Sequence, residues 1–319
     1  TKVSEWTATA IAAALPTTHI DYAGYIAGGT GPDNDTDKFS FPSDTRSVPS
    51  ALNLSSGRAY LGAVSNNSIF AYVAGGADSF PTKVDIVDKF TFPEHVRTTL
   101  SAGLSTASWD CKGMSNSGTA GYFNTIGSSL AIDKFAYSND TRSTISAVTV
   151  WGGDMSAEGC ANGTTVGYWA GGSNGGQGGE PFFADKITKL TFSTDAISTL
   201  SATLWSTIRY LYGMSNSGTA AYFSGGSYYS GGWLVSNKIS KLTYSNETTS
   251  TLSATMSSQR YEGAGLADSG VAGYACGGSN ATTVDKITFS NETSAALSTG
   301  LSVTRDRSGG YAHCEALAQ

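Results

Sequence analysis

Aromatic and arginine side chains are the residues of this sequence whose type and spacing best suit chemistry. One group lies in two glycine-rich inserts, at 173–183 and 227–234, and comprises Phe182, Phe183, Tyr228, Tyr229 and Trp233. A second group lies between repeated segments of the chain and includes Trp151, Arg209 and Arg260. Planar aromatic faces beside polar donors suit sugar rings, and Tyr, Trp and Arg are common at binding hot spots. These eight residues are the predicted ligand-binding set.

Little in the sequence supports an enzyme. There are only three histidines, His19, His95 and His313, and none of them recurs in the repeat described below. No His-Glu-x-x-His pair or phosphate-binding loop is present. A serine nucleophile needs a neighbouring base, and bases are few here. We therefore expect no catalytic residue and no cofactor.

The acids Asp33, Asp35 and Asp37 alternate along one loop and form a weak candidate for a calcium site. An EF-hand loop has glycine at its sixth place and glutamate at its twelfth. Here Lys38 and Phe39 follow the acids instead. The sequence therefore favours a solvated turn over a metal site.

Four cysteines, at 111, 160, 276 and 314, are widely spaced and include no Cys-x-x-Cys pair. This spacing argues against zinc, which structural sites bind with close-spaced pairs. Buried free thiols are the main interpretation, because cysteine is often buried as a small apolar residue. The alternative is a disulfide between Cys276 and Cys314 that fastens the C-terminal strand to the last repeat.

A repeat organises the chain and must position these side chains. The sequence Gly-Met-Ser-Asn-Ser-Gly-Thr-Ala occurs at both 113–120 and 213–220. An aromatic–glycine element recurs at 24–29, 71–76, 121–123, 167–172, 221–226 and 273–278. An Asp-Lys or Asn-Lys pair follows each one, beginning at 37, 88, 133, 185, 237 and 285. These are six copies of a unit of about fifty residues, the length range of kelch-like propeller blades.

Each unit contains four short runs typical of strands. In the fifth unit they are 212–217, 220–224, 238–244 and 250–256. Four strands repeated radially indicate a β-propeller, whose crowded inner strands suit glycine and alanine. We predict one all-β domain over residues 1–319, with six four-stranded blades and seven as the alternative. The predicted blades are 8–54, 59–104, 109–150, 151–204, 205–256 and 259–301. Residues 1–22 are expected to hold the innermost strand of the first blade, and 308–319 a closing strand.

Composition excludes some partners. The net charge of −6 argues against nucleic acid, which needs a basic surface. No apolar run approaches the roughly twenty residues of a membrane-spanning helix, so we expect no membrane insertion. The turn sequence Ser-Asn-Asp/Glu-Thr recurs at 138–141, 245–248 and 290–293, and its Asn-x-Thr sequons, at Asn139, Asn246 and Asn291, permit glycosylation in a secreted protein. Tight turns are the favoured interpretation, because Asn and Asp stabilise them in any compartment.

Strand connectivity predicts where the candidate residues gather. In a four-stranded blade, the loop from the second to the third strand and the loop to the next blade lie on one face. Both groups of candidate residues are on such loops, and loops on a rigid scaffold commonly bind ligands. For residues in the register of the repeat, such as Tyr210 and Tyr261, packing between blades is the favoured interpretation, and binding is favoured for Tyr228, Tyr229, Trp233, Phe182 and Phe183, which lie outside that register.

The units, with their Gly-Tyr-x-x-Gly-Gly and Asp-Lys-Ile/Phe elements, resemble kelch-type propeller repeats. They are most similar to the variant in tail-fibre and other virion structural proteins of marine cyanobacterial phages. This resemblance implies an exposed virion appendage that contacts the host surface, and it carries over no catalytic residue. We predict a non-enzymatic adhesion module, in the virion or extracellular, that binds cell-surface carbohydrate. The alternatives are a structural virion protein or scaffold that binds other virion proteins, and a secreted lectin.

Overall fold

The computed structural model describes residues 22–313, apart from 30, 32, 68, 80, 126–130, 146–155 and 174–182. Within these ranges the chain forms β-strands and one short 3-10 turn, η1 (Ser50–Leu52), and contains no α-helix. No helix of the described part is long and apolar enough to cross a membrane. The predicted all-β class is confirmed.

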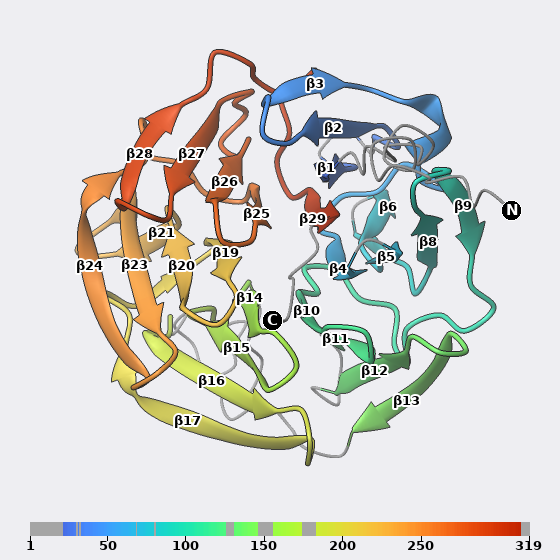
Figure 1. Ribbon diagram of the computed structural model, residues 1–319, viewed down its shortest axis with the longest axis horizontal. Coiled ribbons are helices and arrows are strands. Elements are labelled where there is room, and N and C mark those ends of the chain that lie inside the picture. Colours follow the sequence, from blue (N-terminus) through green and yellow to red (C-terminus); the bar gives the residue numbers. More distant parts are fainter. Residues whose placement is uncertain are drawn as a thin grey trace, which may run out of the picture.

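Six antiparallel sheets of four strands make up most of the described chain (Figure 1). From the inner to the outer strand, sheet 1 is β29 (Gly309–His313), β1 (Ala23–Ala27), β2 (Thr36–Ser40) and β3 (Thr45–Ser47). Sheet 2 is β4 (Gly62–Asn66), β5 (Phe70–Ala74), β8 (Val87–Thr91) and β9 (Val96–Thr99). Sheet 3 is β10 (Gly113–Asn116), β11 (Ala120–Asn124), β12 (Ile132–Ala136) and β13 (Thr141–Ile145).

The other three sheets repeat this order of strands. Sheet 4 is β14 (Glu158–Asn162), β15 (Val166–Ala170), β16 (Lys186–Thr191) and β17 (Ala196–Thr203). Sheet 5 is β19 (Tyr212–Asn216), β20 (Ala220–Ser224), β23 (Lys238–Thr243) and β24 (Thr248–Thr255). Sheet 6 is β25 (Ala264–Asp268), β26 (Ala272–Cys276), β27 (Val284–Thr288) and β28 (Thr293–Ala296).

Burial falls from the centre of the molecule to its rim. The aromatic–glycine element forms the second strand of each sheet, and β1, β5, β11, β20 and β26 are buried at every residue. The outer strands β3 and β9 are exposed along their whole length. A strand buried on both sides needs apolar or small residues throughout. The sheets therefore pack face to face around the centre, which fits a propeller-like fold.

The inner strands lie side by side around that centre. They contact one another in the order β4, β10, β14, β19, β25 and β29, and β29 in turn contacts β4. The crowding explains the predicted glycines, because a methyl group on Gly265 would overlap the carbonyl oxygen of Gly213 on the neighbouring strand. Only glycine leaves room for such close backbone approach.

Neighbouring sheets are joined by a repeated clasp. Between sheets 2 and 3, the Tyr72 hydroxyl and the Lys89 ammonium both donate to Asp140, which has φ of 58° in the turn after β12. Asp195, Glu247, Glu292 and Asp44 accept in the same way from a Tyr-Lys pair at the next four junctions. The last of these joins sheet 6 to sheet 1. The lysine opposite the tyrosine of the second strand thus joins neighbouring sheets; it belongs to the Asp-Lys element in sheets 2, 3 and 6, whereas in sheets 4 and 5 it is Lys189 and Lys241, three residues after the element's own lysine.

The predicted turns are confirmed at the three Ser-Asn-Asp/Glu-Thr segments. The side-chain oxygens of Asn139, Asn246 and Asn291 each accept from the backbone N–H and hydroxyl of the threonine two residues later. This Asx-turn holds the residue between them in the left-handed conformation, from which its carboxylate reaches the neighbouring sheet.

The prediction for the N-terminal strand was wrong. The place beside β1 in sheet 1 belongs to β29, within the predicted closing strand 308–319, and not to residues 1–22. Gly309 and Gly310 follow a left-handed residue, Arg307, as the other inner strands do, so the C-terminal segment enters the sheet in their register. Residues 1–21 and 314–319 lie outside the described part of the chain.

Candidate functional site

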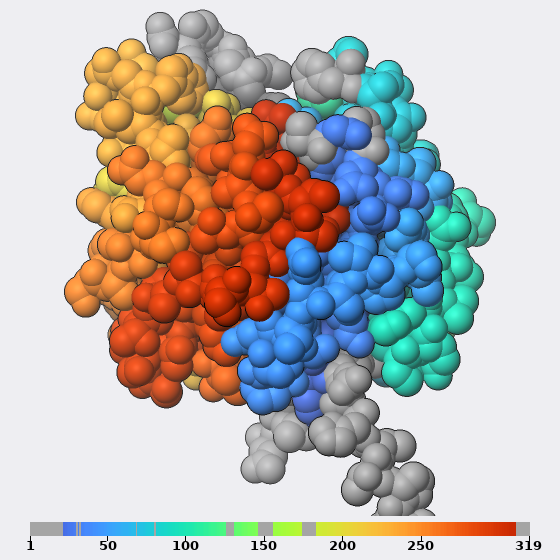
Figure 2. Space-filling model, turned by 90° about the horizontal axis from the view of Figure 1, so that it is seen from above, coloured from blue at the N-terminus to red at the C-terminus, as the bar shows by residue number. Residues whose placement is uncertain are grey.

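Two kinds of loop meet on one face of the molecule, as the connectivity predicted. Between sheets 4 and 5, β18 (Ile208–Arg209) pairs with β21 (Ser227–Tyr229), which pairs with β22 (Trp233–Val235). In sheet 2, β6 (Ala77–Ser79) pairs with β7 (Thr82–Lys83), and Ala59 bridges to Ala77. Figure 2 shows both hairpins, β21–β22 in gold and β6–β7 in cyan, rising from the same face.

The register of the three-stranded sheet gathers three of the predicted residues on one side. Tyr229 lies opposite Trp233, and Arg209 lies opposite Ser227, two residues before Tyr229. Alternate residues of a strand point to the same side of a sheet. Arg209, Tyr229 and Trp233 therefore share one side, and Tyr228 points to the other.

Aromatic rings surround Arg209 on that side. Its guanidinium carbon lies 4.8 Å from the ring centroid of Phe183, 4.8 Å from that of Trp233 and 4.5 Å from that of Tyr210. Phe183 arrives from the sheet 4 insert, where it bridges to Ser173, and its ring centroid is 5.2 Å from that of Trp233. The rings of Trp233 and Tyr229 are 5.9 Å apart. We call Phe183, Arg209, Tyr210, Tyr229 and Trp233 the Arg209 cluster.

The Arg209 cluster has exposed aromatic rings, and its arginine lacks an ion-pair partner among the described residues. Tyr229 and Trp233 are 56% and 55% exposed, unusual for side chains of this size. The Arg209 Nε atom is buried without a hydrogen-bond partner. No carboxylate of the described residues lies within ion-pair distance of its guanidinium. The cluster therefore combines exposed aromatic surface with a positive charge that has no ion-pair partner among the described residues.

Tyr228, on the other side of the hairpin, has a different role from Tyr229. Its ring lies 5.1 Å from that of Trp205 in an edge-to-face arrangement, packed against the core of sheets 4 and 5. The Lys238 ammonium lies 4.0 Å from the Trp205 ring centroid. Tyr228 anchors the hairpin that presents Tyr229 and Trp233.

Arg260 does not line this face, so its prediction as a ligand-binding residue was wrong. It is 2% exposed, and its guanidinium donates to the carbonyl oxygens of Gly277 and Thr283 and pairs with Asp285. Arg58 makes the equivalent contacts with Gly75, Ile86 and Asp88.

The physical reason is a register shift of one residue. Arg209-Tyr210 and Arg260-Tyr261 look equivalent in the sequence, but the left-handed residue is Tyr210 in one loop and Glu262 in the other. The carbonyl oxygens of Ile208 and Arg260 accept from the matching glycines Gly172 and Gly226. Arg260 therefore occupies the buried position of Ile208, one residue before the exposed position of Arg209.

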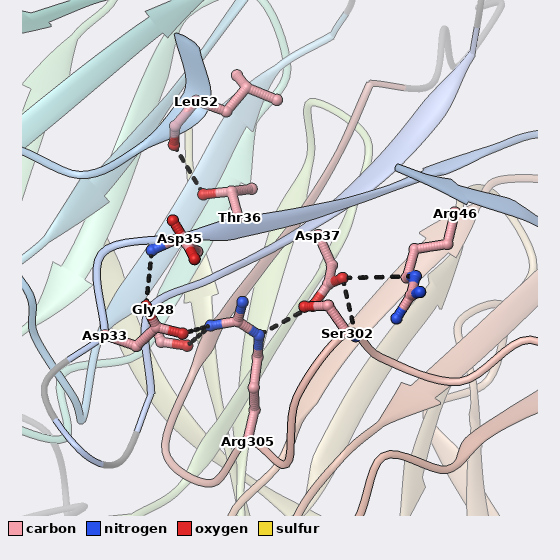
Figure 3. Close-up of polar contacts among 9 residues, drawn as sticks. All are labelled: Gly28, Asp33, Asp35, Thr36, Asp37, Arg46, Leu52, Ser302 and Arg305. Carbon is pink, nitrogen blue, oxygen red and sulfur yellow. Dashed lines mark hydrogen bonds and ion pairs between the residues drawn. The ribbon is translucent and has the colours of Figure 1, made fainter. Parts of the chain in front are cut away.

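The acids proposed as a weak calcium site hold an arginine (Figure 3). Arg305 donates from Nη1 to Asp33 at 2.7 Å and from Nε to Asp37 at 2.9 Å. Ser302 also donates to Asp37, and the Asp33 side chain accepts from the Asp35 backbone N–H. Within the described residues no three His, Cys, Asp or Glu side chains are grouped to hold a metal ion. These carboxylates instead bind the segment before β29 to sheet 1.

The other predicted residues fall into two sets. Cys276 is buried and forms no disulfide within the described residues, and burial raises the pKa of its thiol. Its proposed partner Cys314, together with Trp151 and Phe182, lies outside the described residues.

A ring of corner residues on the same face was not predicted. The residues that enter the six inner strands all have φ between 54° and 64°, namely Tyr60, Asp110, Ser156, Tyr210, Glu262 and Arg307. Backbone hydrogen bonds join five of the six pairs of neighbouring residues in this set. For example, the Asp110 N–H donates to the Tyr60 carbonyl oxygen, and the Tyr60 N–H donates to the Arg307 carbonyl oxygen. We call these six residues the corner ring. Its members share a backbone conformation but no residue type, so only the aligned loops could have indicated it.

Two ion pairs lie around the corner ring. Arg307 pairs with Glu262 at 2.9 Å and Lys112 with Glu158 at 3.5 Å. Burial raises the pKa of Glu262 and of Glu158, although the neighbouring cations oppose this shift. Beneath the ring, Lys112, Glu158 and Ser308 line a cavity of about 70 Å³ together with glycines of the inner strands. The axis is thus polar and contains ion pairs, whereas Arg209 pairs with no acid of the described residues.

Sheets and loops together define an all-β protein with a propeller-like fold and an aromatic face. No family model matches the sequence, and no curated protein matches it. A solved structure described as "Structure of YjhT" matches with a TM-score of 0.67 and 15% identity, over 89% of this chain and 99% of that chain. At this identity the likeness shows the fold alone.

Proposed function

We propose that the chain is a closed, six-bladed, kelch-like propeller that acts as a non-enzymatic binding module. Three features support closure: the contact of β29 with β4, the pairing of β29 with β1, and the clasp from Lys286 of sheet 6 to Asp44 of sheet 1. A closed ring of sheets is a rigid scaffold for its loops, and the sequences of those loops can vary without changing the scaffold.

We propose that the Arg209 cluster binds carbohydrate. The observation that carries this proposal is that Tyr229 and Trp233 are more than half exposed while a hairpin holds them against Phe183 and Arg209. A fixed aromatic face stacks on the C–H face of a sugar at little cost in side-chain entropy, and the guanidinium edge donates hydrogen bonds to hydroxyl groups.

The proposed setting is a virion appendage of the tail-fibre type that contacts glycan on a host surface. This part rests on the resemblance of the repeat units. A protein-binding scaffold is the second candidate, favoured by Leu234, which is 42% exposed on the side of β22 opposite Trp233. A protein partner would cover both sides of the hairpin, whereas a sugar stacked on Trp233 would cover one.

A glycan array followed by calorimetry tests the proposal. We expect retention of at least one glycan, and Trp233→Ala to weaken its binding by about tenfold or more, as for an aromatic hot spot. Ile69→Ala is the matched control, because Ile69 is 59% exposed on the turn between β4 and β5, at the opposite face. Glycan binding that Trp233→Ala leaves unchanged would place the site elsewhere. Loss of a protein partner with Leu234→Ala, without any glycan bound, would favour the scaffold.

A further inference from the structure

Arg209 differs from the other arginines of the loops that join the sheets. Arg58, Arg260, Arg305 and Arg307 each pair with a carboxylate at 2.9 Å or less. Arg209 has only aromatic neighbours at its guanidinium and no carboxylate within ion-pair distance among the described residues. The chain has a net charge of −6, so its acidic residues outnumber its basic ones. Within the described part of the chain, the charge of Arg209 therefore has no ion-pair partner.

Two lysines on the same face repeat this arrangement. The Lys238 ammonium lies 4.0 Å from the Trp205 ring centroid, and the Lys83 ammonium lies 4.9 Å from that of Trp109. Neither has a carboxylate within ion-pair distance in the described part of the chain. By contrast, the ammonium groups of Lys89, Lys134, Lys241 and Lys286, which also lie near rings, each pair with an acid of the neighbouring sheet.

The aromatic rings keep these cations in place without neutralising them. A cation over a ring is held by the ring's quadrupole, but its N–H donors remain available at the edge of the group. Arginine has a planar fork of donors that matches an oxyanion in two parallel hydrogen bonds. The Arg209 cluster thus combines a stacking surface with an anion-binding edge.

We propose that the ligand of this face is an acidic glycan, in which a carboxylate or sulfate group pairs with Arg209 while a sugar ring stacks on Trp233. Lys238 and Lys83 add positive potential that attracts a charged polysaccharide to the face. This inference rests on the proposed carbohydrate-binding function and adds the charge of the ligand to it.

Calorimetry with three oligosaccharides of equal length tests this inference. The probes are an oligogalacturonate, a sulfated galactan fragment and a neutral galactan fragment. We expect one or both acidic probes to bind more tightly than the neutral one. Arg209→Gln should weaken acidic binding by about tenfold, the scale of a lost charge-assisted hydrogen bond, and weaken neutral binding less, because a neutral sugar loses only hydrogen bonds to its hydroxyl groups. The carboxylate and sulfate arms identify which acidic group the site accepts.

Arg142→Gln is the control for loss of charge, because Arg142 is exposed on the outer strand β13 and has no carboxylate within ion-pair distance among the described residues. The Arg142→Gln variant should bind the acidic probes as tightly as the unchanged protein does. The thermal unfolding midpoints of Arg142→Gln and Arg209→Gln should confirm that both variants fold.

Equal binding of neutral and acidic probes, or equal effects of Arg209→Gln on both, would overturn the acidic ligand. If Trp233→Ala then weakened the binding of both the neutral and the acidic probes, the proposal that the site binds carbohydrate would still hold. Binding of an acidic peptide but of no oligosaccharide would overturn both proposals.

Discussion

Arg209 and Arg260 stand in neighbouring loops, each followed by a tyrosine, yet the fold uses them in opposite ways. Arg260 is buried, donates to two carbonyl oxygens and pairs with Asp285. Arg209 lies over three aromatic rings at the surface and pairs with no acid of the described residues. A shift of one residue relative to the left-handed corner separates the two environments.

The comparison distinguishes two parts of the protein: the contacts that join the sheets, which we call the frame, and the exposed Arg209 cluster, which we call the face. The frame consists of the buried Arg-Asp pairs, the inner-strand glycines and the clasps between sheets, whose ion pairs and close contacts are formed within the protein. The Arg209 cluster has exposed rings and a cation that pairs with no acid of the described residues, and we propose that a ligand completes its interactions. Substitutions in the frame should therefore reduce stability, and substitutions in the Arg209 cluster should reduce binding.

The largest expected effect comes from breaking the buried pair. Arg260→Ala leaves the Asp285 carboxylate, which is 0% exposed, without its cation. Removing one partner of a buried ion pair costs about 3–5 kcal/mol. We expect that loss in the free energy of unfolding, measured by urea denaturation.

Arg209→Ala is the matched comparison, and it should cost about 1 kcal/mol through lost contact with the rings. Similar losses of stability in the two variants would contradict the distinction between frame and face.

A smaller effect is expected at the axis. Gly265→Ala places a methyl group against the backbone of Gly213 on the next inner strand, and overpacking of this kind costs about 1–3 kcal/mol. Gly232→Ala, in the hairpin that carries Trp233, meets no atom within 4 Å and should be nearly neutral. Thermal unfolding of both variants measures the difference. A stable Gly265→Ala protein would mean that the inner strands pack more loosely than described.

Sequence reasoning succeeded where one local pattern decides the outcome. In the fifth unit, the predicted runs 220–224 and 238–244 correspond to β20 and β23 because alternation and bounding turns mark each strand. Phe183, Arg209, Tyr229 and Trp233 come together because connectivity alone determines which loops share a face.

It failed where the outcome depends on register or on pairing between distant segments. Arg260 was misplaced because a match of residue types hid the shift relative to Glu262. The choice of β29 over residues 1–22 as the inner strand of sheet 1 depends on pairing between opposite ends of the chain. The corner ring has a common φ and no common side chain, so residue identity does not reveal it.

The junction between sheets 1 and 2 is the exception within the frame. Where the other five junctions have an acid, this one has His95, with φ of 56° and its Nε2 atom 3.2 Å from the Tyr25 hydroxyl. Lys38, in the recurring lysine position, has no carboxylate within ion-pair distance among the described residues. The other clasps pair lysine and acid at 2.5–2.8 Å.

The smallest expected effect is a gain in stability from completing this clasp. His95→Asp supplies a carboxylate at a left-handed position that Asp tolerates, and partly exposed pairs of this kind contribute about 0.5 kcal/mol. Lys38→Gln in the His95→Asp background should remove the gain, and the same change in the unaltered protein should have little effect. A double-mutant cycle from urea denaturation gives the coupling between the two sites. Zero coupling would mean that the five existing clasps position the sheets without stabilising them.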